Sequence, residues 1–163
     1  MIFVTVGTHD QQFDRLLREV DRLVAQKTIG GKVIAQIGNS KYRPRNYEYF
    51  TFSSWRRILD LNKRSNVVIT HGGAGSIMLA AHFNKPIVAV PRRKKYGEHA
   101  DDHQIQLVRE LEKEKRVIAV YEIENLSNAI KKAKLLKSKN RSRQKEKKII
   151  SVIRSYVQNL AGR

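Results

Sequence analysis

The middle of the chain carries the stretch Thr70-His71-Gly72-Gly73-Ala74-Gly75-Ser76. An apolar run, 67–69, leads into it, and a second apolar segment, 77–81, follows. This order predicts a short buried strand, a glycine-rich turn and the start of a helix. Unpaired amides at a helix N-terminus point into such a turn, and glycines let a ligand approach the backbone. The stretch predicts a site for a phosphorylated ligand, with a nucleotide diphosphate as first candidate. A turn packed for structure alone is the alternative.

The spacing separates this loop from two better-known phosphate loops. It is not a P-loop, because no Lys follows Gly75. Nor is it a complete dinucleotide-binding loop, because Met78 stands where the third glycine would be. His71 and Ser76 add side chains that can donate to an oxyanion, which a purely structural turn would not require.

Composition narrows the class of protein. The 163 residues include no cysteine, which excludes disulfides, a thiolate nucleophile and a thiolate metal site. The first residues lack the basic region of a signal peptide, and no apolar run approaches the ~20 residues that span a bilayer. The chain is expected to be soluble or peripherally bound, in the cytoplasm.

The charge is strongly basic. The formal net charge is +18, from 33 basic and 15 acidic residues. Such a balance predicts a polyanionic partner, which could be nucleic acid, an anionic membrane surface or an acidic protein. Ten basic residues and one acid lie between Lys131 and Lys148. Residues 92–95 form a second basic cluster, which is expected to be a solvated loop rather than a binding site.

Short apolar segments alternate with helical patterns along the chain. Strands are expected near 1–6, 32–37, 47–52, 67–70, 87–90 and 116–120. Helices are expected near 11–26, from a cap at Ser53 or Ser54 through 61, over 75–83 and over 101–114. This alternation predicts an α/β fold with a Rossmann-like, doubly wound parallel sheet. Ligands bind at the carboxyl ends of such strands, an edge that should gather residues 7–9, 38–40, 71–76 and 91–104.

Two histidine-containing segments belong to that edge. His9 follows Gly7 and Thr8 and could act as a base, although the segment could equally be an ordinary helix N-terminus. His99 and His103 stand one helical turn apart with carboxylates between them, which invites a metal site. The preferred interpretation puts Asp101 and Asp102 in the first turn of a helix. His103 and Gln104 would then face a polyhydroxylated ligand, and no metal is expected.

Residues 126–163 are predicted to form a basic, amphipathic, helical tail to a domain that spans 1–125. The tail has an apolar stripe at 126, 130 and 133, and more apolar residues at 135–136 and 149–160. A basic amphipathic helix suits a membrane surface or a partner protein. Nucleic acid is a weaker candidate, because no recognised nucleic-acid module or stacking array of aromatics accompanies the charge.

Together these motifs resemble a known family. The order of residues 4–9, 69–76, 85–86, 90–91 and 102–104 is similar to the C-terminal, donor-binding domain of glycosyltransferase family 28. The resemblance covers about residues 1–125. It is strongest for the short stand-alone form, which includes the catalytic subunit of the two-part dolichol-diphosphate N-acetylglucosaminyltransferase and prokaryotic counterparts in polysaccharide assembly.

The resemblance implies the C-terminal half of a two-domain GT-B enzyme that binds a UDP-sugar without a metal or other cofactor. It implies His9 as the catalytic candidate. The implied donor-binding residues are Gly7, Thr8, Ser53, His71, Gly72, Gly73, Ala74, Gly75, Ser76, His103 and Gln104. One departure is Leu79, which stands where the family usually has an acid that contacts ribose.

A half-enzyme needs a second half. The resemblance implies a membrane-anchored partner subunit that carries the acceptor site, and a lipid-diphosphate-linked sugar as acceptor at the cytosolic membrane face. The expected reaction is an inverting transfer of a sugar, N-acetylglucosamine being the first candidate. The alternative, which Leu79 favours, is a non-catalytic adaptor that activates a partner transferase.

Overall fold

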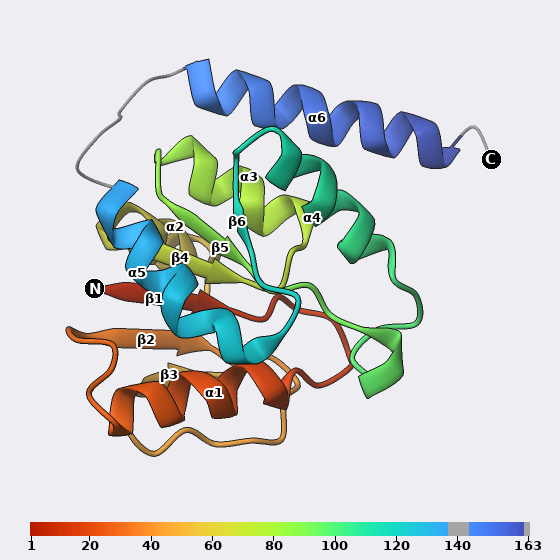
Figure 1. The fold of residues 1–163 in the computed structure, drawn as a ribbon. Helices are drawn as coiled ribbons and strands as arrows, with labels where there is room; N and C mark the ends of the chain where they lie inside the picture. Colours follow the sequence, from red (N-terminus) through yellow and green to blue (C-terminus); the bar gives the residue numbers. More distant parts are fainter. Residues whose placement is uncertain (137–143, 162–163) are drawn as a thin grey trace.

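A computed structural model gives the fold of this chain and describes residues 1–136 and 144–161. A six-stranded, fully parallel sheet with the order β3-β2-β1-β4-β5-β6 forms its centre (Figure 1). The strands are β1 (Ile2–Thr5), β2 (Val33–Gln36), β3 (Glu48–Phe50), β4 (Val67–Thr70), β5 (Ile87–Ala89) and β6 (Ile118–Ala119). Chain order reverses between β1 and β4, so the predicted doubly wound sheet is confirmed.

Helices cover both faces of the sheet. They are α1 (Asp14–Ala25), α2 (Trp55–Arg64), α3 (Ala74–His82), α4 (His103–Lys113), α5 (Leu126–Leu136) and α6 (Gln144–Ala161). Two short 3₁₀ turns, η1 (Lys94–Tyr96) and η2 (Ile123–Asn125), lie in the loops. The Ser54 side chain caps α2 by accepting from the amide of Arg57 at 3.4 Å, which decides between the two predicted caps. No helix of the described residues is long and apolar enough to cross a bilayer.

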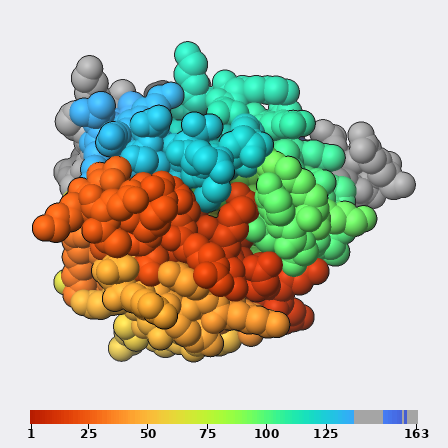
Figure 2. All heavy atoms as spheres, turned by 60° about the horizontal axis from the view of Figure 1, so that its bottom comes forward, coloured from red at the N-terminus to blue at the C-terminus, as the bar shows by residue number. Residues whose placement is uncertain are grey.

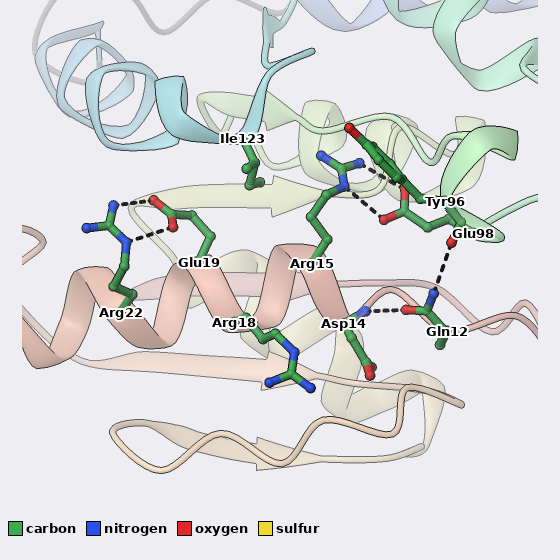
Figure 3. A pocket seen from close by; sticks show the side chains of 9 residues that line it. All are labelled: Gln12, Asp14, Arg15, Arg18, Glu19, Arg22, Tyr96, Glu98 and Ile123. Atoms are coloured by element: carbon green, nitrogen blue, oxygen red, sulfur yellow. Dashed lines mark hydrogen bonds and ion pairs between the residues drawn. The ribbon is translucent and has the colours of Figure 1, made fainter.

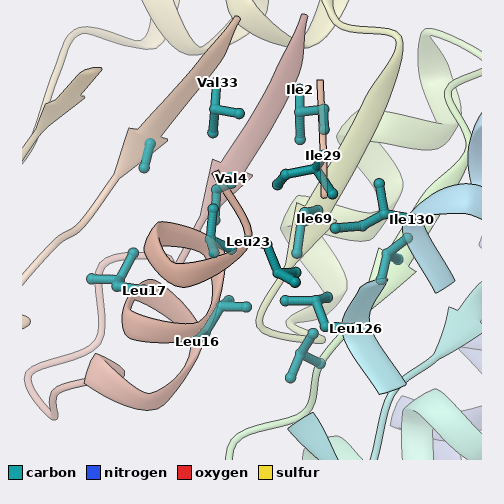
Figure 4. Packing of buried hydrophobic residues seen from close by; sticks show 14 of the residues in the cluster. Ile2, Val4, Leu16, Leu17, Leu23, Ile29, Val33, Ile69, Leu126 and Ile130 are labelled. Atoms are coloured by element: carbon teal, nitrogen blue, oxygen red, sulfur yellow. The ribbon is translucent and has the colours of Figure 1, made fainter. Parts of the chain in front are cut away.

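Alternate residues of the strands pack on opposite faces, except in β3, where Glu48 and Tyr49 are exposed. Ile2 and Val4 of β1 join the cluster beneath α1 and α5, whereas Phe3 joins the cluster beneath α2, α3, α4 and α6. Figure 4 shows the first cluster, in which Leu16 and Leu23 of α1 meet Leu126 of α5 over the sheet. Both faces are therefore buried, as the near-continuous apolar strands predict.

The C-terminal segments pack on this sheet. The predicted stripe of α5 is confirmed, because Leu126, Ile130 and Ala133 are all buried in the cluster beneath α1. Ile149 and Ile153 of α6 are buried against the cluster that includes α3 and α4. These apolar positions of the tail therefore serve the fold. Residues 137–143, which carry part of the predicted basic run, lie outside the described residues.

Candidate functional site

Two glycine-containing loops emerge side by side at the centre of the carboxyl edge. Their strands pair in register, with Thr5 of β1 opposite Thr70 of β4. The amide of His71 then donates to the carbonyl of Thr5 at 3.2 Å. The chain leaves β1 through Gly7, at φ +76°, and leaves β4 through Gly72, at φ +86°. Both turns need glycine because an L side chain rarely adopts such angles.

The His71 side chain lies between the two loops and explains two more features of them. A Cβ at Gly7 would lie 2.6 Å from His71 Cε1, and a Cβ at Gly73 would lie 2.3 Å from His71 Nε2. Neither position can therefore carry a side chain while the imidazole keeps its place. His71 Nδ1 lies 3.4 Å from the Thr5 carbonyl oxygen. Burial, reinforced by the positive charge of Arg92, lowers the pKa of His71 to about 4.

His71 is consequently a neutral ring at neutral pH, packed under both loops. The sequence identified His71 as a donor to an oxyanion, and that role stays a prediction. The structure also gives His71 a role in packing the two loops. The imidazole sets the spacing between the two loops, and their glycines leave the room that it needs.

Helix α3 begins in the second loop with an open N-terminus. Its cap residue is Gly73, which has no side chain to bond the first amides, and the first turn contains no acid. Gly75 is exposed, and a Cβ there would meet nothing within 4 Å. An uncapped helix start beside a second glycine turn can hold an anion through main-chain amides. The hydroxyl of Ser76, also in the first turn, is half-buried.

The expected solvated loop at 92–95 is wrong for its first residue. Arg92 is 1 % exposed, and its guanidinium donates to the carbonyls of Val6, Gln11, Gln12 and Glu98 at 2.8–3.0 Å. Burial lowers the pKa of Arg92 to about 10, so the group stays charged at neutral pH. Lys94 and Lys95 are exposed, as expected.

Arg92 joins the loop after β5 to the loop after β1. Figure 2 shows these segments in contact, the green β5–α4 loop against the red start of the chain. A second buried group reinforces the joint, because the carboxylate of Glu98 binds Arg15 of α1 at 2.8 and 2.9 Å. Sequence reasoning missed both Arg92 and Glu98. The only signal was a basic cluster with a carboxylate six residues on, which is common in exposed loops.

His9 lies in the loop after β1, next to the contact that Arg92 makes between the two loops. Its side chain is exposed, and its ring stacks on that of His99 with centroids 4.7 Å apart. His99 in turn lies 3.2 Å from the carboxylate of Asp101. Partial burial and the neighbouring His99 lower the pKa of His9, which favours the neutral form that accepts a proton. The geometry is compatible with a base at this position.

His103 and Gln104, which the sequence predicts to face a polyhydroxylated ligand, lie at the start of α4, with one change from the prediction. Helix α4 begins at His103, so Asp101 and Asp102 precede it instead of forming its first turn. The turn is shaped by those side chains, because Asp101 accepts from the amide of His103 at 2.9 Å and Asp102 from the amide of Lys94 at 3.0 Å. The side-chain carbonyl oxygen of Gln104 accepts a hydrogen bond from the Arg92 amide at 3.2 Å, so its NH₂ group can donate to a ligand.

Ser53 lies apart from the other candidates. It follows β3, two strands from β1, or about 10 Å along the sheet. The structure thus brings together Gly7, His71 and Gly73 by direct contact. Two further pairs lie next to these three residues, beside the buried Arg92 guanidinium. They are His9 stacked on His99, and Gln104 bonded to the Arg92 amide.

A separate groove lies away from the glycine loops. A groove of about 670 Å³ runs along α1 and is lined by Gln12, Asp14, Arg15, Arg18, Glu19, Arg22, Tyr96, Glu98 and Ile123 (Figure 3). Its arginines already have partners within the chain, since Arg15 binds Glu98, Arg22 binds Glu19 and Arg18 stacks on Tyr42. This groove therefore offers less to an anion than the glycine loops. Among residues 1–136 and 144–161, no group of three acidic or histidine side chains could hold a metal ion.

Comparison with known proteins defines the class to which this fold and edge belong. Residues 1–159 match the family model of the glycosyltransferase family 28 C-terminal domain. The chain belongs to that family, and its sheet corresponds to the C-terminal half of a GT-B glycosyltransferase.

Individual relatives agree. The chain is 34 % identical over 122 residues to the UDP-N-acetylglucosamine transferase subunit ALG13 of Homo sapiens, and 31 % identical over 121 residues to that of Mus musculus. Each match covers 69 % of this chain and only 10 % of the relative. Among solved structures, the glycotransferase of kitacinnamycin superposes with a TM-score of 0.55 at 16 % identity, over 95 % of this chain and 39 % of that one.

Proposed function

We propose that this chain is the donor-binding, catalytic subunit of an inverting, UDP-sugar-dependent glycosyltransferase. The observation that carries the proposal is the pair of glycine loops fitted around His71, with the uncapped start of α3 beside them. The diphosphate of the donor would lie against the amides of Ala74, Gly75 and Ser76. Those amides, being fixed in place, stabilise the charge that UDP gains as it leaves.

The transfer breaks the bond between C1 of the donor sugar and the β-phosphate oxygen. The acceptor hydroxyl oxygen forms the new bond to C1 from the opposite face, and its proton passes to a base. His9, whose pKa is lowered toward the neutral ring, is the candidate in this chain. The acceptor is a lipid-diphosphate-linked sugar, carried by a membrane-anchored partner subunit at the cytosolic face. N-acetylglucosamine is the proposed sugar because the ALG13 relatives are N-acetylglucosamine transferase subunits.

Titration calorimetry with UDP and with UDP-N-acetylglucosamine tests donor binding in the isolated chain. We expect heat of binding for the native chain and none for Gly73→Asp, whose side chain would displace the His71 ring and disrupt the two loops that hold the diphosphate. Gly30→Asp is the matched control, because a Cβ at that glycine meets nothing within 4 Å. Equal binding by the Gly73→Asp variant would remove the assignment. Transfer by the chain with its partner should fall at least about 100-fold in His9→Ala if His9 is the base.

A second function is favoured by one residue. Leu79 follows Ser76 by one helical turn and offers no acceptor to a ribose hydroxyl. A chain that binds no donor would act as an adaptor that activates its partner. The calorimetry separates the two functions, because an adaptor would release no heat with UDP.

A further inference from the structure

Two exposed aromatic residues stand close together in the chain at one end of the sheet. Phe52 is 49 % exposed and Trp55 is 65 % exposed. They lie in the loop after β3 and at the start of α2, with Arg56 and Arg57 next along the helix. We call these four residues the aromatic-basic patch. Because β3 is an outer strand, the patch lies at the rim of the carboxyl edge that also carries the glycine loops.

The packing of α2 does not explain Trp55. The helix buries Leu61 and packs Ile58 against the cluster beneath it. Its one aromatic residue, Trp55, is instead exposed in the first turn. Burying a large aromatic side chain contributes roughly 1.5–3 kcal/mol, so a Trp that is two-thirds exposed forgoes stability that a partner surface could supply. The side chain is thus available to a partner outside the fold.

The charge around the patch is positive. The exposed face of α2 carries Arg56, Arg57, Lys63 and Arg64 against one acid, Asp60, which lies 3.3 Å from Arg64. Arg57 stacks 4.4 Å above the ring of Phe50, which holds its charge beside the aromatic residues. A tryptophan followed by two arginines suits the interfacial zone of an anionic bilayer, where the ring lies at headgroup depth and the cations meet lipid phosphates.

We propose that the aromatic-basic patch docks this chain on an anionic membrane surface. The C-terminal tail is less suited to the apolar part of that task, because Ile149 and Ile153 are buried against the sheet domain. Docking through the rim would hold the glycine loops close to the bilayer. That consequence rests on the proposed function, which places the acceptor on a lipid, whereas docking itself depends only on the patch.

The sequence provides its own probe, because Trp55 is its only tryptophan. The native full chain is mixed with vesicles of phosphatidylcholine and phosphatidylglycerol, and separately with vesicles of phosphatidylcholine alone. We expect the emission of Trp55 to shift to shorter wavelength with the anionic vesicles only, and the shift to diminish as salt is raised. Binding of the anionic vesicles with unshifted emission would overturn the proposal, because the basic tail alone would then account for it.

Vesicle flotation of variants gives a second measurement. Trp55→Ala should weaken binding about tenfold or more, and Arg56→Gln about fivefold. The matched control is Leu135→Ala, an apolar residue that is 72 % exposed on α5 and should leave binding unchanged. Equal losses for Trp55→Ala and Leu135→Ala would contradict the patch. A shift of Trp55 emission by UDP in the absence of vesicles, with none caused by vesicles, would assign the patch to the nucleotide instead.

The two proposals can fail separately. Absence of heat in the UDP titration removes the donor site and leaves the vesicle result intact. Unshifted emission on vesicles removes the docking surface and leaves donor binding intact.

Discussion

The β4–α3 loop and the β5–α4 loop meet at one edge of the sheet, yet different groups hold them. The first is built from main chain and glycine around one neutral imidazole, and its amides face outward. The second is fixed by the buried charges of Arg92 and Glu98, which bind carbonyls and a partner side chain. The loop with the most cations is therefore held in place by its own buried charges, and we propose the loop with almost no charge as the anion site.

The first test of this contrast is whether Arg92 stabilises the fold. Arg92→Ala removes a buried cation, leaves four carbonyls without their donor and strips Glu98 of one neighbour. We expect the free energy of unfolding to fall by about 3–5 kcal/mol. Urea unfolding followed by circular dichroism measures the loss. Lys95→Ala, in the same basic cluster but exposed, should change stability by less than about 0.5 kcal/mol.

Similar losses in the two variants would show that Arg92 is not scaffold. Arg92→Lys sharpens the test. Lysine keeps the positive charge, but it lacks the planar guanidinium that binds carbonyls of three chain segments at once. It should lie between the native chain and Arg92→Ala.

The second test titrates the imidazole of the first loop. The pKa of His71 is about 4 in the folded chain against an ordinary value near 6.5. Between these values the unfolded chain binds a proton that the folded chain does not, so stability falls as pH falls. The full loss, complete below about pH 4, is about 3 kcal/mol. Urea unfolding at pH 7, 5 and 4 should show a steeper decline for the native chain than for His71→Gln. Parallel declines would mean that His71 is not buried as a neutral ring.

The third test concerns the fit between glycine and imidazole. Gly73→Ala places a Cβ against His71 Nε2 and should cost about 1–3 kcal/mol, although φ at this position, −69°, suits alanine. Gly75→Ala, two residues later, meets nothing and should be neutral or slightly stabilising. Urea midpoints compare the two. The cost of Gly73→Ala should shrink in a His71→Ala background, and a cost unchanged there would exclude the proposed contact.

Sequence reasoning predicted the sheet well because its signal is local. The apolar run 87–90 is bounded by Pro86 and Pro91, and in α1 the residues that recur at helical spacing are all packed against the sheet. Helix starts were less accurate. Asp101 and Asp102 have the composition of a first turn, but each bonds an amide nearby, and α4 begins after them.

The site was predictable only in part. The glycines of residues 72–75 predict a tight turn whose backbone lies close to another group, but they do not identify that group. For Gly7 and Gly73, the neighbouring group is the His71 ring. This ring also contacts the carbonyl of Thr5, which is 66 residues away in the chain. Arg92 was misread for a related reason. Three of its four carbonyl partners are 80 or more residues away in the chain, and no local pattern distinguishes a buried arginine from a solvated one.

The last test asks whether the open loop binds a nucleotide as strongly as its geometry allows. Leu79 lies one turn after Ser76 on α3, so both side chains share a helix face. Leu79→Glu would supply a charged acceptor for a ribose hydroxyl on that face, and we expect UDP to bind about tenfold more tightly, or about 1.4 kcal/mol. Calorimetry with the native chain and with Met78→Glu, an exposed neighbour on another face, isolates the effect.

Each outcome of that last test bears on the two candidate functions. A gain at residue 79 and none at residue 78 would place the ribose over α3 and show that the amides of the glycine loop already bind the diphosphate, since a ribose contact adds affinity only to a bound nucleotide. An equal gain at both positions, or none at either, would mean that UDP does not lie along α3. The open loop would then be free to contact a partner subunit, as the adaptor function requires.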